Sequence, residues 1–131
     1  MSLCVIDTSV LIAIAFAEAN ADELTSAIAS YAERFIGVPS LLEAGMVFAA
    51  RKAKTHRDPI DQLVAAFNLQ PLQFSAEMEA HAWRAWLRYG KGRHPASLNF
   101  GDCMSYGVAA ALNAPLLFVG HDFSQTDIEA A

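Results

Sequence analysis

The chemistry-bearing side chains of this sequence are four acids, each placed beside a short apolar segment: Asp7, Glu43, Asp102 and Asp122. Asp7 directly follows residues 3–6, and Asp122 comes three residues after the apolar segment 116–119. Carboxylate oxygens are the ligands of hard divalent cations such as Mg²⁺ or Mn²⁺. No Cys/His pair has the spacing of a zinc site. The four acids therefore favour a hard-cation site, provided that the fold brings them together.

The segments around these acids predict how they are positioned. The continuous apolar segments 3–6 and 116–119 are typical of strands buried on both faces, and we expect them to be neighbours at the centre of a sheet. Residues 35–38 and 69–74 predict two further strands, and Pro71 places the second of these at an edge. The tail from Thr126 is a candidate for a short last strand.

Helical segments are expected between the strands, at residues 8–17, 20–35, 40–53, 58–67, 75–89 and 101–113. In the second of these, Leu24, Ile28, Tyr31 and Phe35 have the spacing of one helix face. The alternation predicts a single α/β domain over residues 1–131, with three α/β/α layers and a central parallel sheet of four to five short strands. Helices leading away from parallel strands begin at the carboxyl edge of the sheet, so the four carboxylates should converge on that edge.

Composition narrows the class of protein. Of the 131 residues, 54% are hydrophobic and 18% are charged, which indicates a dense core and excludes a disordered chain. No apolar run approaches the ~18 residues of a membrane span, and residues 1–6 lack the pattern of a signal peptide. Cys4 and Cys103 both fall in segments expected to be buried, so they do not form a disulfide framework. We expect a cytoplasmic protein.

The basic residues are few but clustered. The net charge is −5, and all but one of the nine Lys and Arg residues fall in two blocks, within residues 51–57 and 84–93. Two basic rims around an acidic centre favour a polyanionic substrate. The alternative is that both blocks are solubilising helix ends.

Each acid also has a purely structural explanation. Asp7 can be a helix N-cap, and Asp122 a turn residue. Glu43 with Ser40, and Asp102 with Asn99, have the spacing of a helix capping box. Convergence favours the metal site over these alternatives, because two carboxylates ~5 Å apart repel by about 3 kcal/mol at an effective dielectric near 20. A cation relieves that repulsion.

Several motifs, in their order along the chain, resemble the PIN domain: Asp7-Thr8-Ser9, the Ser40/Glu43 pair, Asn99-Phe100-Gly101-Asp102 and Gly120-His121-Asp122-Phe123. More narrowly, the chain looks like the VapC ribonuclease toxins of bacterial toxin–antitoxin pairs. The loop 90–95 and the Thr126-Asp127 pair strengthen this likeness, which spans the whole chain.

The resemblance implies an Mg²⁺-dependent endoribonuclease in which Asp7, Glu43, Asp102 and Asp122 are both the catalytic acids and the metal ligands. Ser9 matches a supporting polar residue. His121 stands where the family more often has Asn or Asp, and it would play a supporting part whose charge varies near neutral pH. The implied partners are an RNA substrate and a VapB-type antitoxin.

The residues proposed to contact RNA lie in and beside the second basic block: Arg88, Lys91, Arg93 and His94. The high apolar content of so small a chain also favours a homodimer. Two alternatives remain open: a catalytically inactive PIN-fold binding module, and a receiver-like phosphoacceptor domain. The second would need a lysine near the carboxyl end, and none occurs after Lys91.

Overall fold

The structure is a computed structural model that describes residues 2–131. Its strands are β1 (Leu3–Ile6), β2 (Glu33–Gly37), β3 (Gln70–Leu72) and β4 (Leu116–Leu117). Its helices are α1 (Thr8–Ala15), α2 (Ala21–Ala29), α3 (Val38–Lys52), α4 (Asp58–Ala66), α5 (Ala76–Tyr89) and α6 (Phe100–Leu112), and a 3-10 turn follows at Phe123–Gln125. Within residues 2–131, no helix is both long and apolar enough to span a membrane.

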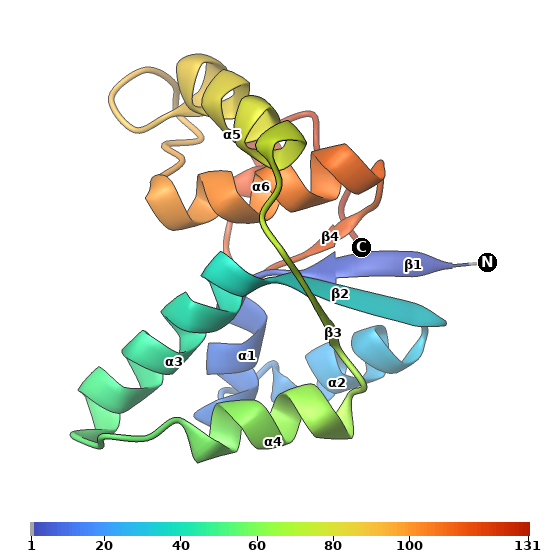
Figure 1. Cartoon of the computed structure of the whole chain (residues 1–131), viewed down its shortest axis with the longest axis vertical. Coiled ribbons are helices and arrows are strands. Elements are labelled where there is room, and N and C mark those ends of the chain that lie inside the picture. Colours follow the sequence, from blue (N-terminus) through green and yellow to red (C-terminus); the bar gives the residue numbers. More distant parts are fainter. Residues whose placement is uncertain (1) are drawn as a thin grey trace.

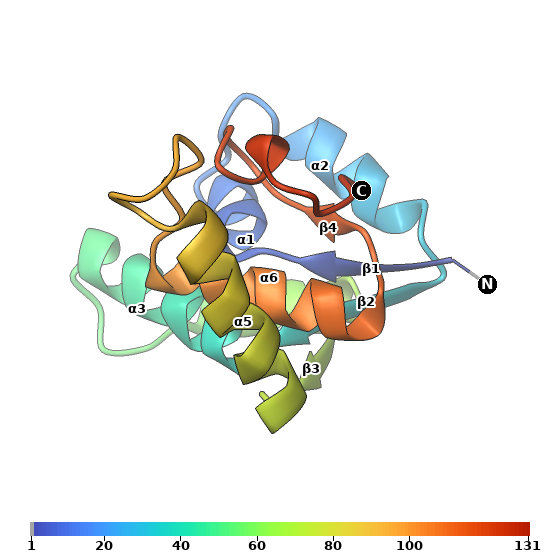
Figure 2. The same cartoon turned by 90° about the horizontal axis from the view of Figure 1, so that it is seen from above.

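The strands form one parallel sheet in the order β3-β2-β1-β4. Helices α5 and α6 cover one face, while α1 to α4 lie on the other (Figure 1). Seen from above, α5 crosses over α6 (Figure 2). The predicted three-layer α/β/α architecture with a parallel sheet is therefore confirmed.

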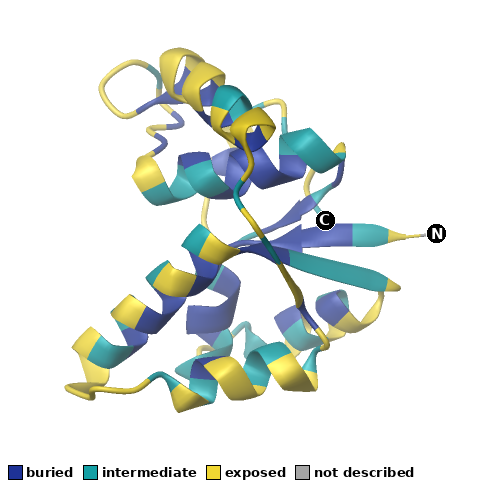
Figure 3. Ribbon diagram, in the orientation of Figure 1, coloured by how far each residue is buried: buried dark blue, intermediate teal, exposed yellow. Residues whose placement is uncertain are grey.

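The sheet separates two apolar cores. Cys4 and Ile6 of β1 belong to the core shared with α1 to α4, whereas Val5 belongs to the core shared with α5 and α6. Successive strand residues point to opposite faces, so a strand covered on both sides must be apolar throughout. This explains the continuous apolar segment before Asp7, of which Cys4, Val5 and Ile6 are buried (Figure 3).

The helix predicted over residues 20–35 is wrong in its second half. Helix α2 ends at Ala29, and Phe35, which the spacing placed on the helix face, lies in β2. Backbone pairing with β1 joins Leu3 to Glu33 and Val5 to Phe35. The helix-like spacing of apolar residues continues beyond the end of α2, but pairing with the buried strand β1 decides the structure there.

The fourth strand is also not central, contrary to the prediction. Strand β4 neighbours β1 as expected, but it is the last strand in the sheet. Its outer side is covered by the chain terminus, where Leu116 forms an isolated parallel bridge with Ala130. The expected fifth strand is reduced to this bridge, and the cover explains why an edge strand is apolar.

Helix α3 begins earlier than predicted. Gly37 is its N-cap, and Pro39 lies in its first turn, where proline is tolerated. Ser40 is therefore inside the helix, and the capping-box explanation of Glu43 is wrong. Glu43 lies one turn further along α3.

Helix α5 starts as predicted, with the Ser75 side chain accepting a hydrogen bond from the backbone of Met78. Met78, Ala82 and Tyr89 of this helix are buried, whereas Trp86 is 36% exposed and stacks on Trp83. Cys4 and Cys103 are free, buried thiols, as expected. Burial raises the pKa of each to about 11.

Candidate active site

A cavity of about 280 Å³ opens where β1, α1, α3 and α6 meet. Three of the four predicted acids, Asp7, Glu43 and Asp102, line it together with Ser9 and Asn99. Helices α1, α3 and α6 start on the side of the sheet where β1 ends (Figure 1). The expected convergence of acids from distant parts of the sequence is thus present for these three.

Asp7 is the N-cap of α1 and is only 5% exposed. One carboxylate oxygen accepts two hydrogen bonds from Ser9, at 3.1 Å from the backbone nitrogen and 2.5 Å from the hydroxyl. The Ser9 hydroxyl in turn accepts from the backbone nitrogen of Val119, at 3.0 Å. Ser9 therefore fixes Asp7 and ties it to the chain that leaves β4.

The other oxygen of Asp7 accepts a hydrogen bond from the buried hydroxyl of Ser105, on α6. Ser40 lies 3.0 Å from the Ser105 hydroxyl. Because a hydroxyl has one hydrogen and that of Ser105 is given to Asp7, Ser40 must be the donor in this pair. The Ser40 carbonyl is itself bound by the Thr8 hydroxyl, at 2.9 Å.

This chain of buried hydroxyls is the part of the site that sequence analysis missed. It joins α1, α3 and α6 around one carboxylate, so Ser40 serves the site and not the helix start. A signal was available for Ser105, because it follows Asp102 by three residues and is a polar group on an otherwise small and apolar helix.

Asp102 lies in the first turn of α6, where it forms the predicted capping box with Asn99. The Asn99 side chain accepts from the backbone of Asp102 at 2.8 Å, and Asp102 accepts from the backbone of Asn99 at 3.1 Å. Partial burial raises the pKa of Asp102 to about 7, against the Asn99 hydrogen bond, which lowers it. The negative charges of Asp7 and Asp122, and a side-chain hydrogen bond with Asp122, also contribute to this raised pKa. Asp102 therefore takes part in capping α6 and also lies near other acids.

Glu43 can reach this site because Gly101 has no side chain. A Cβ atom built on Gly101 would lie only 2.5 Å from one Glu43 carboxylate oxygen and 2.6 Å from the other. The carboxylate thus packs directly against the start of α6, next to Asp102. Any larger residue at 101 would push it away.

Asp122 lies outside the cavity lining, on an exposed turn after β4. It immediately precedes the 3-10 turn, as its interpretation as a turn residue predicts, but its side chain makes no capping bond there. Its charge acts on Asp102, which shows that the two carboxylates are neighbours. His121 is exposed beside it, and its carbonyl accepts from Ser124 at 2.7 Å.

One basic residue also borders the cavity. Arg51, from the first basic block, lines it together with Glu18, and its guanidinium lies 5.2 Å from the centre of the Phe16 ring. Arg51 was predicted only as part of a basic rim. The structure places it at the acidic site itself.

The residues predicted to contact RNA do not line the cavity. Arg88 lies 3.7 Å from Asp127, and Arg93 donates to the Leu87 carbonyl at 3.2 Å. His94 accepts from the backbone of Ala96 at 3.0 Å and packs edge-on against Tyr89. Lys91 is exposed in the loop between α5 and α6.

The donor set fits a cation that keeps part of its water shell. Within residues 2–131, no group of three or more His, Cys, Asp or Glu side chains is arranged so that it could hold a metal ion alone. Mg²⁺ is usually held by one or two carboxylates and retains several waters. Buried Asp7 beside Asp102, whose pKa is raised by its acidic neighbours, supplies such carboxylates.

Comparison with known proteins agrees with the fold. The PIN domain family model matches residues 4–129. Ribonuclease VapC36 of Mycobacterium tuberculosis is 40% identical over 126 residues, covering 95% of this chain and 91% of the relative.

Two solved structures have the same fold. VapC20 of Mycobacterium tuberculosis, described as a sarcin-ricin loop cleaving toxin, has a TM-score of 0.74 at 18% identity and covers 98% of both chains. The VapBC2 complex of Rickettsia felis, bound to a promoter DNA fragment, has a TM-score of 0.68 at 19% identity and covers 98% of this chain and 96% of the other. With a whole-chain family match and a relative of this similarity, the chain belongs to the PIN domain family and, within it, to the VapC ribonucleases.

Proposed function

We propose that this chain hydrolyses phosphodiester bonds of RNA with the help of a divalent cation, Mg²⁺ or Mn²⁺, in the bacterial cytoplasm. One observation carries the proposal: a cavity at the carboxyl end of β1 lined by Asp7, Glu43 and Asp102, with Asp122 close to Asp102. Carboxylates gathered from four separate elements repel one another, and a hard cation is the ligand that makes their proximity favourable.

The surroundings of each residue suggest its role in the reaction. When bound, the cation would lower the pKa of a water molecule and neutralise charge on the scissile phosphate. Asp7 and Asp102 would hold it, because Asp7 is fixed by hydrogen bonds at both oxygens and Asp102 lines the same cavity. Glu43 or Asp122 would orient the attacking water or accept its proton. Ser9 and Ser105 would keep Asp7 in place.

The test is cleavage of a generic single-stranded RNA with and without Mg²⁺. The wild type should cut only with the cation, and Asp102→Asn should lose cleavage while its unfolding transition remains cooperative. A wild type that binds RNA but never cuts it with either Mg²⁺ or Mn²⁺ would favour the inactive binding module. Cleavage that persists unchanged in EDTA would exclude metal-dependent chemistry.

For RNA contact, we propose Lys91 and Arg51 ahead of Arg88, Arg93 and His94. Lys91 is exposed and Arg51 borders the acidic cavity, whereas the other three are engaged within the chain. Lys91→Ala should reduce the slope of log affinity against log salt by roughly 0.7, the value for one phosphate contact on a single strand. An unchanged slope would assign Lys91 to surface solubility.

For control, we propose neutralisation by a VapB-type antitoxin. The solved neighbours include VapBC complexes, such as that of Rickettsia felis. A guanidinium from the antitoxin could pair with two of the clustered carboxylates and so take the place of the cation. Inhibition should then weaken as Mg²⁺ is raised and should require the antitoxin's arginine. Equal inhibition after replacing every arginine of its tail would favour steric cover instead.

For assembly, we propose a homodimer through an exposed apolar surface on α3, α5 and α6, made of Leu42, Met46, Trp83, Trp86, Phe100 and Met104. Phe100 is 79% exposed and borders two adjoining apolar grooves. Exposed apolar surfaces of this kind mark protein interfaces. Phe100→Asp should convert a dimer to a monomer in light scattering. A monomeric wild type would instead leave this surface to the antitoxin.

A further inference from the structure

Asp122 belongs to the segment 119–128, which runs from β4 to the far end of α6. Phe123 is its apolar anchor, 2% exposed, with its ring centre 5.2 Å from that of Phe118. Apolar packing resists removal of the ring but sets no direction for the residues around it. Asp122 itself is exposed, and its side chain makes no capping bond to the 3-10 turn that follows it.

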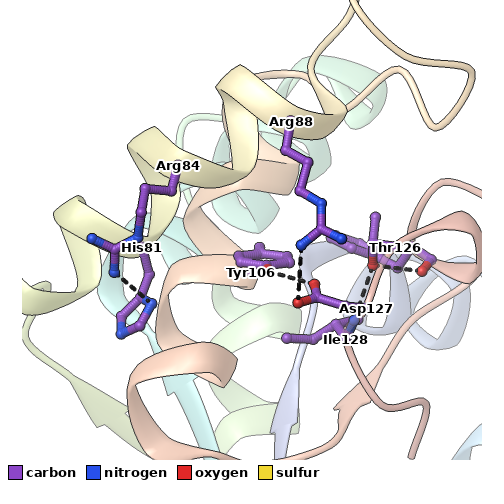
Figure 4. Close-up of polar contacts among 8 residues, drawn as sticks. His81, Arg84, Arg88, Tyr106, Thr126, Asp127 and Ile128 are labelled. Carbon is purple, nitrogen blue, oxygen red and sulfur yellow. Dashed lines mark hydrogen bonds and ion pairs between the residues drawn. The ribbon is translucent and has the colours of Figure 1, made fainter.

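A polar attachment lies further along the same segment, at Asp127. The Tyr106 hydroxyl of α6 donates to one Asp127 oxygen at 2.5 Å, and Arg88 of α5 lies 3.7 Å from the other (Figure 4). Burial and the neighbouring carboxylate both raise the pKa of Tyr106, so its hydroxyl stays protonated and remains a donor. The Arg88 contact is exposed and of lesser strength.

The turn between the two aspartates is closed by its own hydrogen bonds. The Thr126 hydroxyl donates to the Phe123 carbonyl at 2.7 Å and accepts from the backbone of Ile128 at 3.2 Å (Figure 4). A shift of Asp127 is therefore transmitted to the residues beside Asp122.

Helix α6 presents two side chains to this segment. Asp102 and Tyr106 are four residues apart, so they lie on the same side of the helix, one turn from each other. Asp102 has Asp122 as its neighbour, and Tyr106 binds Asp127. The repulsive pair and the attractive pair thus lie side by side between the same two elements.

We propose that Tyr106 and Asp127, with a smaller contribution from Arg88, are positioning residues that hold Asp122 beside Asp102. The inference rests on the proposed function, because it takes Asp122 as a member of the metal site. When both carboxyl groups are ionised, the Tyr106–Asp127 hydrogen bond opposes the repulsion between Asp102 and Asp122. Arg88, predicted from sequence to contact RNA, would then act within the chain.

The decisive variant is Tyr106→Phe, which removes only the hydroxyl. Its matched control is Tyr89→Phe, because Tyr89 is a buried neighbour, 6.2 Å between ring centres, whose hydroxyl makes no hydrogen bond to residues 2–131 that meets ordinary geometric limits. Mg²⁺ affinity is read from the rise of the melting temperature with Mg²⁺ concentration. Amide hydrogen exchange reports on residues 119–128, and kcat and KM are measured on RNA.

Tyr106→Phe should weaken Mg²⁺ binding by about 10-fold, the lower end of the range for losing a support of a metal ligand. The amides of Thr126 and Ile128 should exchange faster, with little change in residues outside 119–128. At fixed Mg²⁺, kcat should fall while KM for RNA stays constant. Tyr89→Phe should match the wild type in all three measurements.

The Arg88 contribution is tested on the same helix. Arg88→Gln should weaken Mg²⁺ binding by about threefold at most, as expected for an exposed ion pair, and Arg88→Lys should restore it. Arg84→Gln is the control, because Arg84 lies one turn earlier and contacts His81 at 3.2 Å (Figure 4). Equal losses in Arg84→Gln and Arg88→Gln would remove Arg88 from the proposal.

The Asp122→Asn variant separates the metal-site assignment of Asp122 from the positioning role of Tyr106 and Asp127. If it loses Mg²⁺ affinity while Tyr106→Phe and Asp127→Ala retain both affinity and amide protection, the positioning role is overturned and the metal site stands. If Asp122→Asn binds Mg²⁺ and cuts RNA like the wild type, the site assignment of Asp122 fails, and the positioning role fails with it. Faster exchange throughout the chain in Tyr106→Phe would reduce its hydroxyl to a general structural role.

Discussion

The two ends of the acidic site are built in different ways. At one end, Asp7 is buried, caps a helix and accepts hydrogen bonds at both oxygens from Ser9 and Ser105. At the other, Asp122 is exposed on a turn and has no capping bond. The first carboxylate is held by hydrogen bonds that it accepts itself, whereas we propose that contacts elsewhere in its segment position the second.

This difference bears on how a site of repelling charges can exist in a folded chain. A buried carboxylate must be hydrogen-bonded. The groups that satisfy Asp7 in the core are therefore also the groups that position it in the site. An exposed carboxylate needs no such partners, so its position can be set by contacts elsewhere in its segment. We therefore expect substitutions of the hydroxyl groups that bind Asp7 to lower stability and activity together, and substitutions around Asp122 to change activity more.

The largest effect is expected from Asp7→Asn. Loss of the buried carboxylate should abolish Mg²⁺-dependent cleavage, while Asn remains a good N-cap and keeps helix α1. Without metal, the variant should melt no lower than the wild type, because charge repulsion with Asp102 is removed. RNA cleavage and metal-free thermal unfolding measure the two parts. Cleavage at the wild-type rate would show that Asp7 is only a cap.

Ser105→Ala should have the next largest effect. It removes one donor from Asp7 and leaves the buried Ser40 hydroxyl without its acceptor, at a cost of about 1–3 kcal/mol of stability. Cleavage should fall by about 10–100-fold, as for other residues that orient a metal ligand. Denaturant unfolding and single-turnover kinetics test this, with exposed Ser26→Ala on α2 as the control. Full activity in Ser105→Ala would mean that Ser9 alone fixes Asp7.

Gly101→Ala should separate activity from stability. Alanine favours the helix by up to about 1 kcal/mol, but its Cβ would lie 2.5 Å from a Glu43 oxygen. The displaced carboxylate should lower cleavage by up to ~100-fold while the fold keeps or gains stability. In a Glu43→Ala background the same change should cost no further activity. An additive loss in that double variant would place the effect of residue 101 elsewhere.

The last prediction concerns the pH dependence of metal-free stability, where no loss of activity is involved. Partial burial, with the charges of Asp7 and Asp122, raises the pKa of Asp102 from its usual 3.8 to about 7. Between these values the folded chain holds a proton that the unfolded chain has released, so stability should fall as pH rises from about 4 to 7. Asp102→Asn should flatten this slope in urea unfolding at several pH values. A slope that is unchanged in the variant would assign it to other groups.

Sequence alone was sufficient for the parts of the molecule that local rules control. The apolar segment before Asp7 predicts a strand buried on both faces, because pleated strands expose alternate residues to opposite sides. The order of strands and helices predicts the parallel three-layer fold and the edge on which Asp7, Glu43 and Asp102 converge. Pro71 correctly placed β3 at the edge of the sheet.

What tertiary structure alone decided depends on contacts between distant segments. Pairing with β1 turned Phe35 from a helix face into a strand, and the returning terminus allowed apolar β4 to lie at an edge. The hydroxyls of Ser40 and Ser105, 65 residues apart, acquire their role only when α3 and α6 meet. Likewise, the ion pair between Arg88 and Asp127 exists only because the fold places α5 beside the chain that follows β4. Spacing within one element is written in the sequence, whereas the partner of a polar side chain is set by packing between elements.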